Sequence, residues 1–215
     1  MEIITNLMLQ GLQFFYSISG NYGLAIMLFT IAVNVVLYPL TLQSTVQMAA
    51  FQRIQPLMQE IQKKFKDEPQ KLQKEMMELY KKEKVNPFGG CLPTLLKLPF
   101  FIGLFMVLQG KEFVAIIADP KVNASFLWIA NLAKPDHLFI FPILIGLSTY
   151  WMQKTMPTSN VANSQMQMMT YFMPIFLTFI CLSFPTGVQI YWLVSNLMAV
   201  VQQLWIVHKV MPKRA

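Results

Sequence analysis

Three polar residues lie inside apolar stretches of the chain, where their side chains could do chemistry. Thr30 and Asn34 are four residues apart, so a helix would place them one turn apart on the same face. Lys97 is the single charge between Leu92 and Leu108. A lysine inside a membrane costs about 2.5 to 3.5 kcal/mol on insertion scales, so it marks a functional site by default. Hydroxyl, amide and ammonium groups in such a place indicate a path for something polar.

The usual sequence patterns of enzyme catalysis are missing from the chain. It contains no His-Glu-x-x-His, no Gly-x-Ser-x-Gly and no acidic pair within an apolar span. The two histidines, His137 and His208, lie at the edges of spans, so the sequence gives little support for a histidine-based metal site. We therefore expect a protein that is not an enzyme, with no catalytic residue, metal site or cofactor.

The composition is that of a polytopic membrane protein. Apolar residues make up 55% of the 215 residues, charged residues make up 13%, and the mean hydropathy is +0.46. The apolar residues form long blocks rather than amphipathic periods. The net charge of +7 raises the possibility of nucleic acid, but the basic residues lie beside apolar spans without interleaved aromatic residues. DNA is therefore not expected as a partner, whereas anionic lipid or ribosomal RNA at the membrane surface stays possible.

The membrane surface is marked most clearly in residues 80–99, YKKEKVNPFGGCLPTLLKLP, where a charged segment passes into an apolar one. Residues 1–20 lack the features of a cleavable signal and form a pattern typical of a helix lying in the interface. The segment Tyr22 to Leu42 has 21 residues without a charge, about 31 Å of helix, which matches the roughly 30 Å hydrocarbon core. By the same reasoning we predict transmembrane helices at 21–42, 91–110, 137–153, 165–184 and 185–207.

The connecting segments carry nearly all the charge. Residues 43–90 show two narrow apolar stripes separated by Lys66-Asp67-Glu68-Pro69, which predicts a helical hairpin outside the membrane, with Pro69 at or near the start of its second helix. The first stripe is Val46, Ala50, Ile54, Leu57, Ile61 and Phe65, and the second is Leu72, Met76 and Leu79. The remaining connections are a loop at 111–136, a loop at 154–164 and a tail at 208–215.

The distribution of lysine and arginine predicts the orientation. The hairpin, the 154–164 loop and the tail share one side and hold thirteen, whereas the other side holds three. The positive-inside rule places the hairpin and the C-terminus in the cytoplasm and the N-terminus outside. The predicted fold is therefore an all-α membrane protein with five transmembrane helices, a cytoplasmic helical hairpin and an N-terminal interfacial helix.

Three stretches resemble the YidC/Oxa/Alb membrane protein insertases. They are LYPLTLQSTVQMAAFQRIQPLMQEIQ, KVNPFGGCLPTLLKLPFF and FPTGVQIYWLVSNLMAVVQQ, and the similarity runs from about Asn21 to Val207 in the family's order and topology. The resemblance implies the compact bacterial form, which lacks the large extracytoplasmic domain. The resemblance implies a multi-pass insertase of the bacterial plasma membrane. Its five helices would enclose a hydrophilic groove open to cytoplasm and lipid but closed on the outer side, and no nucleotide would be hydrolysed.

One position departs from the family pattern. Family members typically carry a groove arginine where FTIAVNVVLYPL has Asn34, and Lys97 stands where many relatives have glutamine. Both residues lie roughly 10 to 12 Å from the cytoplasmic ends of their helices. Lys97 is therefore either a relocated groove cation with Asn34 as its hydrogen-bonding neighbour, or a lysine that snorkels to the surface while Asn34 makes an ordinary interhelical hydrogen bond.

The resemblance also implies roles for further residues. The other groove candidates are Thr30, Gln189, Trp192 and Ser195, and Trp192 alone would equally suit packing at a span end. The substrate slide, a hydrophobic surface along which a substrate helix would move, would consist of Leu98, Pro99, Phe101, Ile175, Phe176, Ile180 and Leu182.

The implied partners are nascent membrane proteins, the lipid bilayer, the Sec translocon and the ribosome, with the protein working as a monomer. A channel or small-solute transporter is the alternative, because polar residues inside a bundle also mark solute paths. Inverted repeats would support a transporter, and the sequence shows none.

Overall fold

The computed structural model describes residues 2–86, 92–119, 121–155 and 164–210. Within these ranges the regular elements are helices, and the closest approach to a strand is one antiparallel bridge between Phe126 and Ile129. This agrees with the all-α fold that the sequence predicts.

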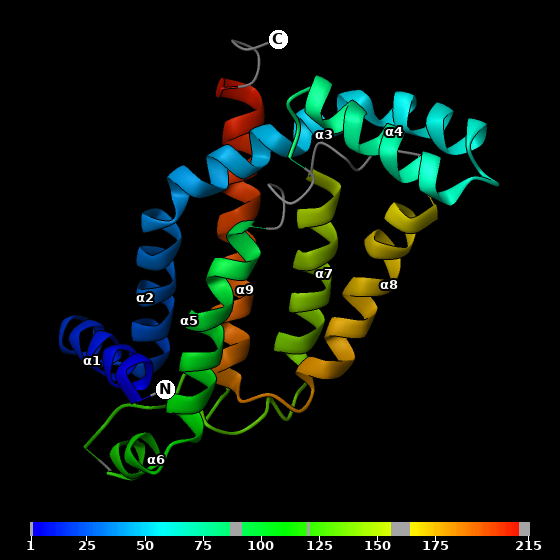
Figure 1. Cartoon of the computed structure of the whole chain (residues 1–215). Helices are drawn as coiled ribbons and strands as arrows, with labels where there is room; N and C mark the ends of the chain where they lie inside the picture. Colours follow the sequence, from blue (N-terminus) through cyan, green and yellow to red (C-terminus); the bar gives the residue numbers. More distant parts are fainter. Residues whose placement is uncertain (1, 87–91, 120, 156–163, 211–215) are drawn as a thin grey trace.

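An upright bundle forms the body of the molecule (Figure 1). The helix α9 is central: it packs on α2, α5 and α7, and α7 also packs on α8. A short π-helical segment, η2, continues α9. The bounds are α2 (Tyr22–Val36), α5 (Leu92–Gln109), α7 (Ile140–Thr155), α8 (Ser164–Cys181), α9 (Thr186–Trp205) and η2 (Ile206–Val210).

The first helix, α1 (Glu2–Ser19), crosses one end of the bundle. The chain turns at Gly20, which has a φ of +66°, and α1 and α2 meet at 116°. One face of α1 is buried through Met8 and Leu12, whereas Leu7 and Ile18 are more than 60% exposed. This amphipathic arrangement is the one expected of an interfacial helix.

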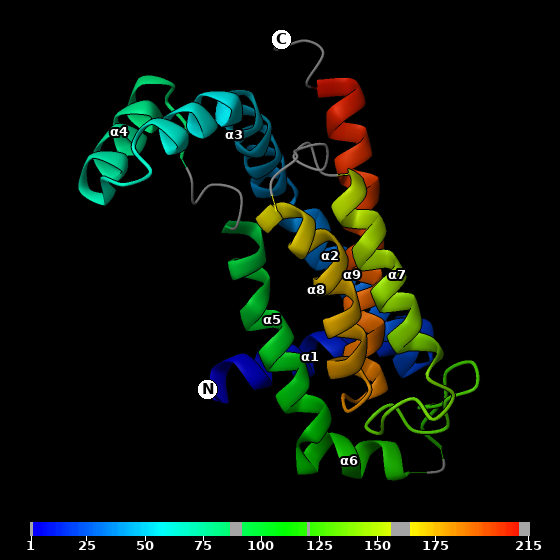
Figure 2. The same ribbon diagram turned by 90° about the vertical axis from the view of Figure 1, so that its right-hand side faces the viewer.

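The same end of the bundle carries a helix that the sequence did not predict. The segment from Lys111 was expected to be a polar loop, but it begins with α6 (Lys111–Ala118), bent by 57° from α5. Phe113 explains the helix, because its ring is 1% exposed and packs edge-to-face on Tyr22. Figure 2 shows α6 and α1 at the same end of the bundle.

At the opposite end, α2 stops earlier than the predicted helical stretch. It ends at Val36, and α3 (Tyr38–Lys64) begins after the single residue Leu37. Pro39 accounts for the break, because it has no N–H to donate to the preceding turn and its ring clashes there. The predicted boundary at Leu42 therefore falls inside α3.

The helices α3 and α4 (Pro69–Lys82) pack against each other through their own small core of Ile54, Met58, Leu79 and Val85. Pro69 is the first residue of α4 and Glu68 is its N-cap, as the sequence predicted. This core is separate from that of the bundle.

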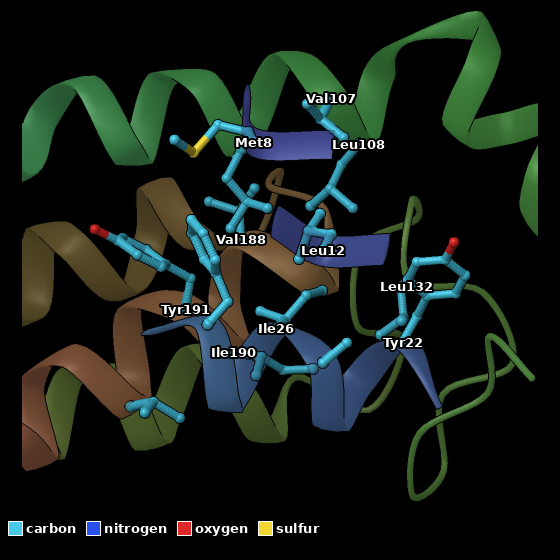
Figure 3. Packing of buried hydrophobic residues seen from close by; sticks show 14 of the residues in the cluster. Met8, Leu12, Tyr22, Ile26, Val107, Leu108, Leu132, Val188, Ile190 and Tyr191 are labelled. Atoms are coloured by element: carbon cyan, nitrogen blue, oxygen red, sulfur yellow. The ribbon is translucent and has the colours of Figure 1, made fainter. Parts of the chain in front are cut away.

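The main core closes the end of the bundle next to α1 (Figure 3). Leu12, Ile26, Leu108 and Val188, from α1, α2, α5 and α9, are completely buried there. Gly187 allows the close approach, because a Cβ at this position would lie 2.7 Å from a methyl carbon of Leu108. Water is therefore excluded from this end.

By length and apolar composition, α9 with η2, over Thr186–Lys209, is long enough to cross a membrane by itself. Two bent pairs reach that length only when each is taken as one span, namely Thr5–Ser19 with Tyr22–Val36 and Lys97–Gln109 with Lys111–Ala118. The apolar helix Thr170–Cys181 is shorter. These lengths refer to the part of the chain that the structure describes.

Candidate hydrophilic groove and apolar face

Above the apolar core, α2 turns two polar side chains into the bundle. Thr30 and Asn34 are both 0% exposed. The Thr30 hydroxyl donates to the Ile26 carbonyl at 2.6 Å, and Asn34 Nδ2 donates to the Thr30 carbonyl at 2.8 Å. Asn34 Nδ2 also reaches Ser195 Oγ on α9 at 3.4 Å. Three of the predicted groove residues, Thr30, Asn34 and Ser195, therefore form one cluster.

The cluster extends through glutamines that the sequence reasoning did not single out. Gln202 Nε2 donates to the Asn34 backbone carbonyl at 3.0 Å. Next to it, the hydroxyl of Thr45 on α3 lies 3.5 Å from Gln203 Oε1. The signal was present in the sequence, because Ser195 and Gln202 are seven residues apart and so share a face of an otherwise apolar helix. We call Thr30, Asn34, Thr45, Ser195, Gln202 and Gln203 the polar cluster.

Several buried polar atoms of this region have no hydrogen-bond partner among the described residues. They are Asn34 Oδ1, Gln202 Oε1, Gln203 Nε2 and the hydroxyl of Tyr38. A buried polar atom without a partner costs about 1 to 3 kcal/mol. Water entering from the α3 end of the bundle would supply the missing partners. These atoms are therefore free to bind water or another polar group.

Lys97 lies on α5, half-buried, outside the polar cluster. Its backbone carbonyl is 3.5 Å from the Tyr191 hydroxyl of α9. Within the described part of the chain, its ammonium forms neither an ion pair nor a hydrogen bond, and none joins it to Asn34. The direct Lys97–Asn34 contact in the relocated-cation hypothesis is thus not formed.

Gln189 and Trp192 have other neighbours. Gln189 Nε2 donates to the carbonyls of Cys181 and Phe184, both at 2.8 Å, and so ties the α8–α9 connection together. Trp192 packs edge-to-face on Phe101 of α5, with ring centroids 5.1 Å apart. Neither residue contacts the polar cluster through a hydrogen bond within the described ranges.

The residues expected to form the substrate slide fall into two groups. Leu98, Ile175 and Phe176 are 43 to 58% exposed, and Pro99 beside them is exposed too. Phe101 is half-buried because it packs inward on Trp192, and Ile180 and Leu182 are also half-buried. Phe172 and Phe179 of α8, at 51 and 67% exposure, extend the exposed group. We call the outward residues of α5 and α8 the apolar face; they are Leu98, Pro99, Phe172, Ile175, Phe176 and Phe179.

A second buried polar contact joins α7 to α9. Asn196 Nδ2 donates to Thr149 Oγ1 at 2.8 Å and to Ser148 Oγ at 3.1 Å. All three residues are at most 5% exposed. This contact holds the bundle together beside the polar cluster. No group of side chains suited to a metal ion occurs in the described ranges.

These features define a helical membrane protein with a buried polar cluster toward one end and an apolar core at the other. A sequence profile of the 60Kd inner membrane protein family matches residues 14–214. The chain belongs to this family, and it is therefore a protein of the bacterial inner membrane.

The relatives are named more specifically. The chain is 43% identical over 203 residues to the membrane protein insertase YidC of Haemophilus ducreyi, covering 94% of this chain and 36% of that protein. It is 45% identical over 192 residues to the YidC of Shewanella halifaxensis, covering 89% and 34%. The chain thus spans about a third of the length of these relatives.

A solved structure agrees with these matches. The fold is similar to an active YidC insertase crystal structure with its first transmembrane domain resolved, with a TM-score of 0.72 and 25% identity over 93% of this chain and 45% of that one. The family indicated by the sequence motifs is confirmed.

Proposed function

We propose that this chain inserts nascent membrane proteins into the bacterial plasma membrane and assists their folding. The observation that carries the proposal is the polar cluster with its unpaired buried atoms. A polar segment of a substrate in hydrocarbon leaves backbone groups unsatisfied, at several kcal/mol each. A wet groove reaching partway across the membrane removes much of this cost, and the names of the relatives agree with such a role.

The groove is open at one end only. The apolar core at the α1 end blocks water, whereas the polar cluster lies toward α3. In the proposed topology α2, α5, α7, α8 and α9 are the five spans. The thirteen basic residues of the hairpin, the Lys154 connection and the tail then face the cytoplasm, and the N-terminus lies outside. The groove opens to the cytoplasm in this arrangement.

The apolar face would receive the hydrophobic segment of the substrate. Leu98 on α5 and Ile175 and Phe176 on α8 are exposed to the surroundings of the bundle, which are lipid in a membrane. Transfer of the substrate's apolar helix into lipid supplies the driving force. The protein lowers the barrier and performs no covalent chemistry, so we propose no cofactor and no catalytic residue.

Lys97 is proposed as the groove cation, acting without direct contact to Asn34. Its ammonium has no counter-ion among the described residues, so it is available to an acidic substrate tail. Replacing it, Lys97→Gln, should reduce insertion of substrates with acidic translocated tails about tenfold, and should spare substrates with neutral tails. Equal insertion of acidic-tailed substrates by the variant and the parent protein would make Lys97 a snorkelling lysine.

The proposed partners follow from the relatives' role. They are nascent membrane proteins, the Sec translocon and the ribosome, with α3 and α4 as the contact region on the cytoplasmic side. The protein is proposed to work as a monomer. A pull-down with ribosomes carrying stalled membrane-protein chains, with and without residues 43–90, measures the contribution of this region.

The deciding experiment combines reconstitution with photocrosslinking. Purified protein in vesicles should integrate a small single-span protein without added energy, and probes at residues 97 and 34 should crosslink to its acidic tail. Crosslinks from 34 alone keep the insertase but remove Lys97 from the groove. Absence of integration, together with specific solute flux, would replace the proposal with a transporter.

A further inference from the structure

A cavity of about 440 Å³ lies between α1, the end of α5 and the start of α6. Its volume is in the range of ligand sites in proteins. Its walls are of two kinds: Leu9, Met106 and Val107 are apolar, whereas Asn6, Lys111 and Glu112 are polar or charged. The helices that line it, α1, α5 and α6, meet at the end of the bundle closed by the apolar core.

The directions of α1 and α6 lead us to place the cavity at the depth of lipid headgroups. The helix α1 meets α2 at 116°, and α6 is bent by 57° from α5, so both helices turn away from the bundle axis at this end. Helices with such an orientation and one apolar face lie in the membrane interface. The cavity between them therefore faces the region where phosphate groups and acyl chains meet.

The charges of the cavity match one class of lipid. Lys111 and Glu112 are adjacent and exposed, and neither forms an ion pair within the described part of the chain. A lysine ammonium binds phosphate, and a carboxylate binds a primary ammonium. Phosphatidylethanolamine carries both groups a few bonds apart, and its acyl chains would follow Leu9 and Met106.

We propose that this cavity binds the headgroup of one phosphatidylethanolamine molecule. Lys111 holds the phosphate, Glu112 holds the ammonium, and the apolar wall takes the start of an acyl chain. The site anchors α1 and α6 to the membrane leaflet on the side opposite to α3 and α4. It goes beyond the insertase function and does not depend on it.

The test uses the full chain in nanodiscs containing equal amounts of phosphatidylethanolamine and phosphatidylglycerol, followed by native mass spectrometry of retained lipids. The parent protein should retain phosphatidylethanolamine preferentially, by about threefold, the size of effect expected from one exposed ion pair. Lys111→Gln should lower retention of both lipids, whereas Glu112→Gln should remove the preference alone. Lys111→Arg keeps the phosphate contact and should retain lipid as the parent does.

Lys121→Gln is the matched control, because Lys121 is an exposed lysine in the segment after α6 and does not line the cavity. It should retain lipid as the parent does. Equal retention of the two lipids by the parent protein, or equal losses in Lys111→Gln and Lys121→Gln, would overturn the proposal. Displacement of the lipid by millimolar inorganic phosphate would also overturn it, since a free anion would then be the ligand.

Discussion

At the scale of single residues, Asp136 organises the loop between α6 and α7. Asp136 is only 1% exposed. Its Oδ1 accepts hydrogen bonds from Trp128 Nε1 at 2.9 Å and from Leu138 N at 3.0 Å. Oδ2 accepts from Phe141 N at 2.8 Å. Burial by itself would raise the pKa of this carboxyl, but the hydrogen bonds from Phe141, Trp128 and the neighbouring backbone outweigh burial and lower it.

The lowered pKa predicts how stability depends on pH. A carboxyl whose folded-state pKa is below its unfolded value of about 3.9 stabilises the fold above that value and loses its contribution as the pH falls through the folded pKa. Asp136→Asn should lower the free energy of unfolding at pH 7 by about 1.5 to 3 kcal/mol. It should also flatten the loss of stability below about pH 4.

The measurement is denaturant unfolding in detergent micelles, followed by circular dichroism between pH 3 and pH 7. Asp119→Asn serves as the control, because Asp119 is exposed and its carboxylate accepts an exposed hydrogen bond from Lys121 N. Asp119→Asn should change the free energy of unfolding by no more than about 0.5 kcal/mol. If the stability of Asp136→Asn changes with pH in parallel with that of the parent protein, the Asp136 carboxylate is not the source of the pH dependence.

The buried hydrogen bond between Asn196 and Thr149 gives a second prediction at the scale of single residues. Its contact with Thr149 should contribute a coupling energy of about 0.6 to 1.7 kcal/mol, the range measured for hydrogen bonds between membrane helices. A double-mutant cycle of Asn196→Ala and Thr149→Val, measured by unfolding in micelles, gives this energy directly. Additive effects of the two changes would mean that the hydrogen bond adds nothing to the packing of α7 on α9.

At the scale of elements, α7 and α8 meet through a glycine. A Cβ at Gly146 would lie 2.1 Å from Thr178 Oγ1 and 3.3 Å from the Pro174 carbonyl oxygen. Gly146→Ala should therefore separate the two helices and lower the free energy of unfolding by about 1 to 3 kcal/mol. Unfolding of the double variant Gly146→Ala with Thr178→Ala should recover most of the loss, because the clashing hydroxyl is gone. If the double variant does not regain stability, the contact with the Thr178 hydroxyl is not the cause of the loss.

The elements differ in how far the sequence determines them. The start of α4 was predictable because Pro69 has a fixed φ and no N–H, which suits the first turn of a helix. A proline at position 39 also predicts a bend at the end of the first span, and the helix breaks at Leu37 because the effect of proline falls on the turn that precedes it. The helix α6 was missed because Phe113 and Tyr22 are far apart in sequence, and their packing supports it.

The polar cluster, too, was predictable from the sequence only where its residues are close together in the chain. The sequence put Thr30 and Asn34 on one face through their four-residue spacing, which is a local property. The contact of Asn34 with Ser195 joins residues 161 positions apart and depends on how α9 is rotated against α2. Packing of the whole bundle sets that rotation. Gln189 is six residues before Ser195 and therefore about 120° away from it around α9, where it faces the α8–α9 connection.

At the scale of the whole molecule, α9 contributes to both the apolar core and the polar cluster. Val188 is completely buried in the apolar core, and Ser195, seven residues later on the same face, is part of the polar cluster. A membrane-impermeant maleimide should therefore react with Ser195→Cys at least about tenfold faster than with Val188→Cys, because thiolates form only where water reaches them. The background for both variants is Cys91→Ala with Cys181→Ala.

The labelling should also depend on the side of the membrane from which the maleimide is added. Reagent added on the side of α3 and α4 should label Ser195→Cys in sealed vesicles, whereas reagent added on the side of α1 and α6 should not. The expectation follows from the seal, since a reagent from the α1 side would have to cross the layer formed by Leu108 and Val188. Equal labelling from both sides would mean a continuous water path, and the groove would then be a channel.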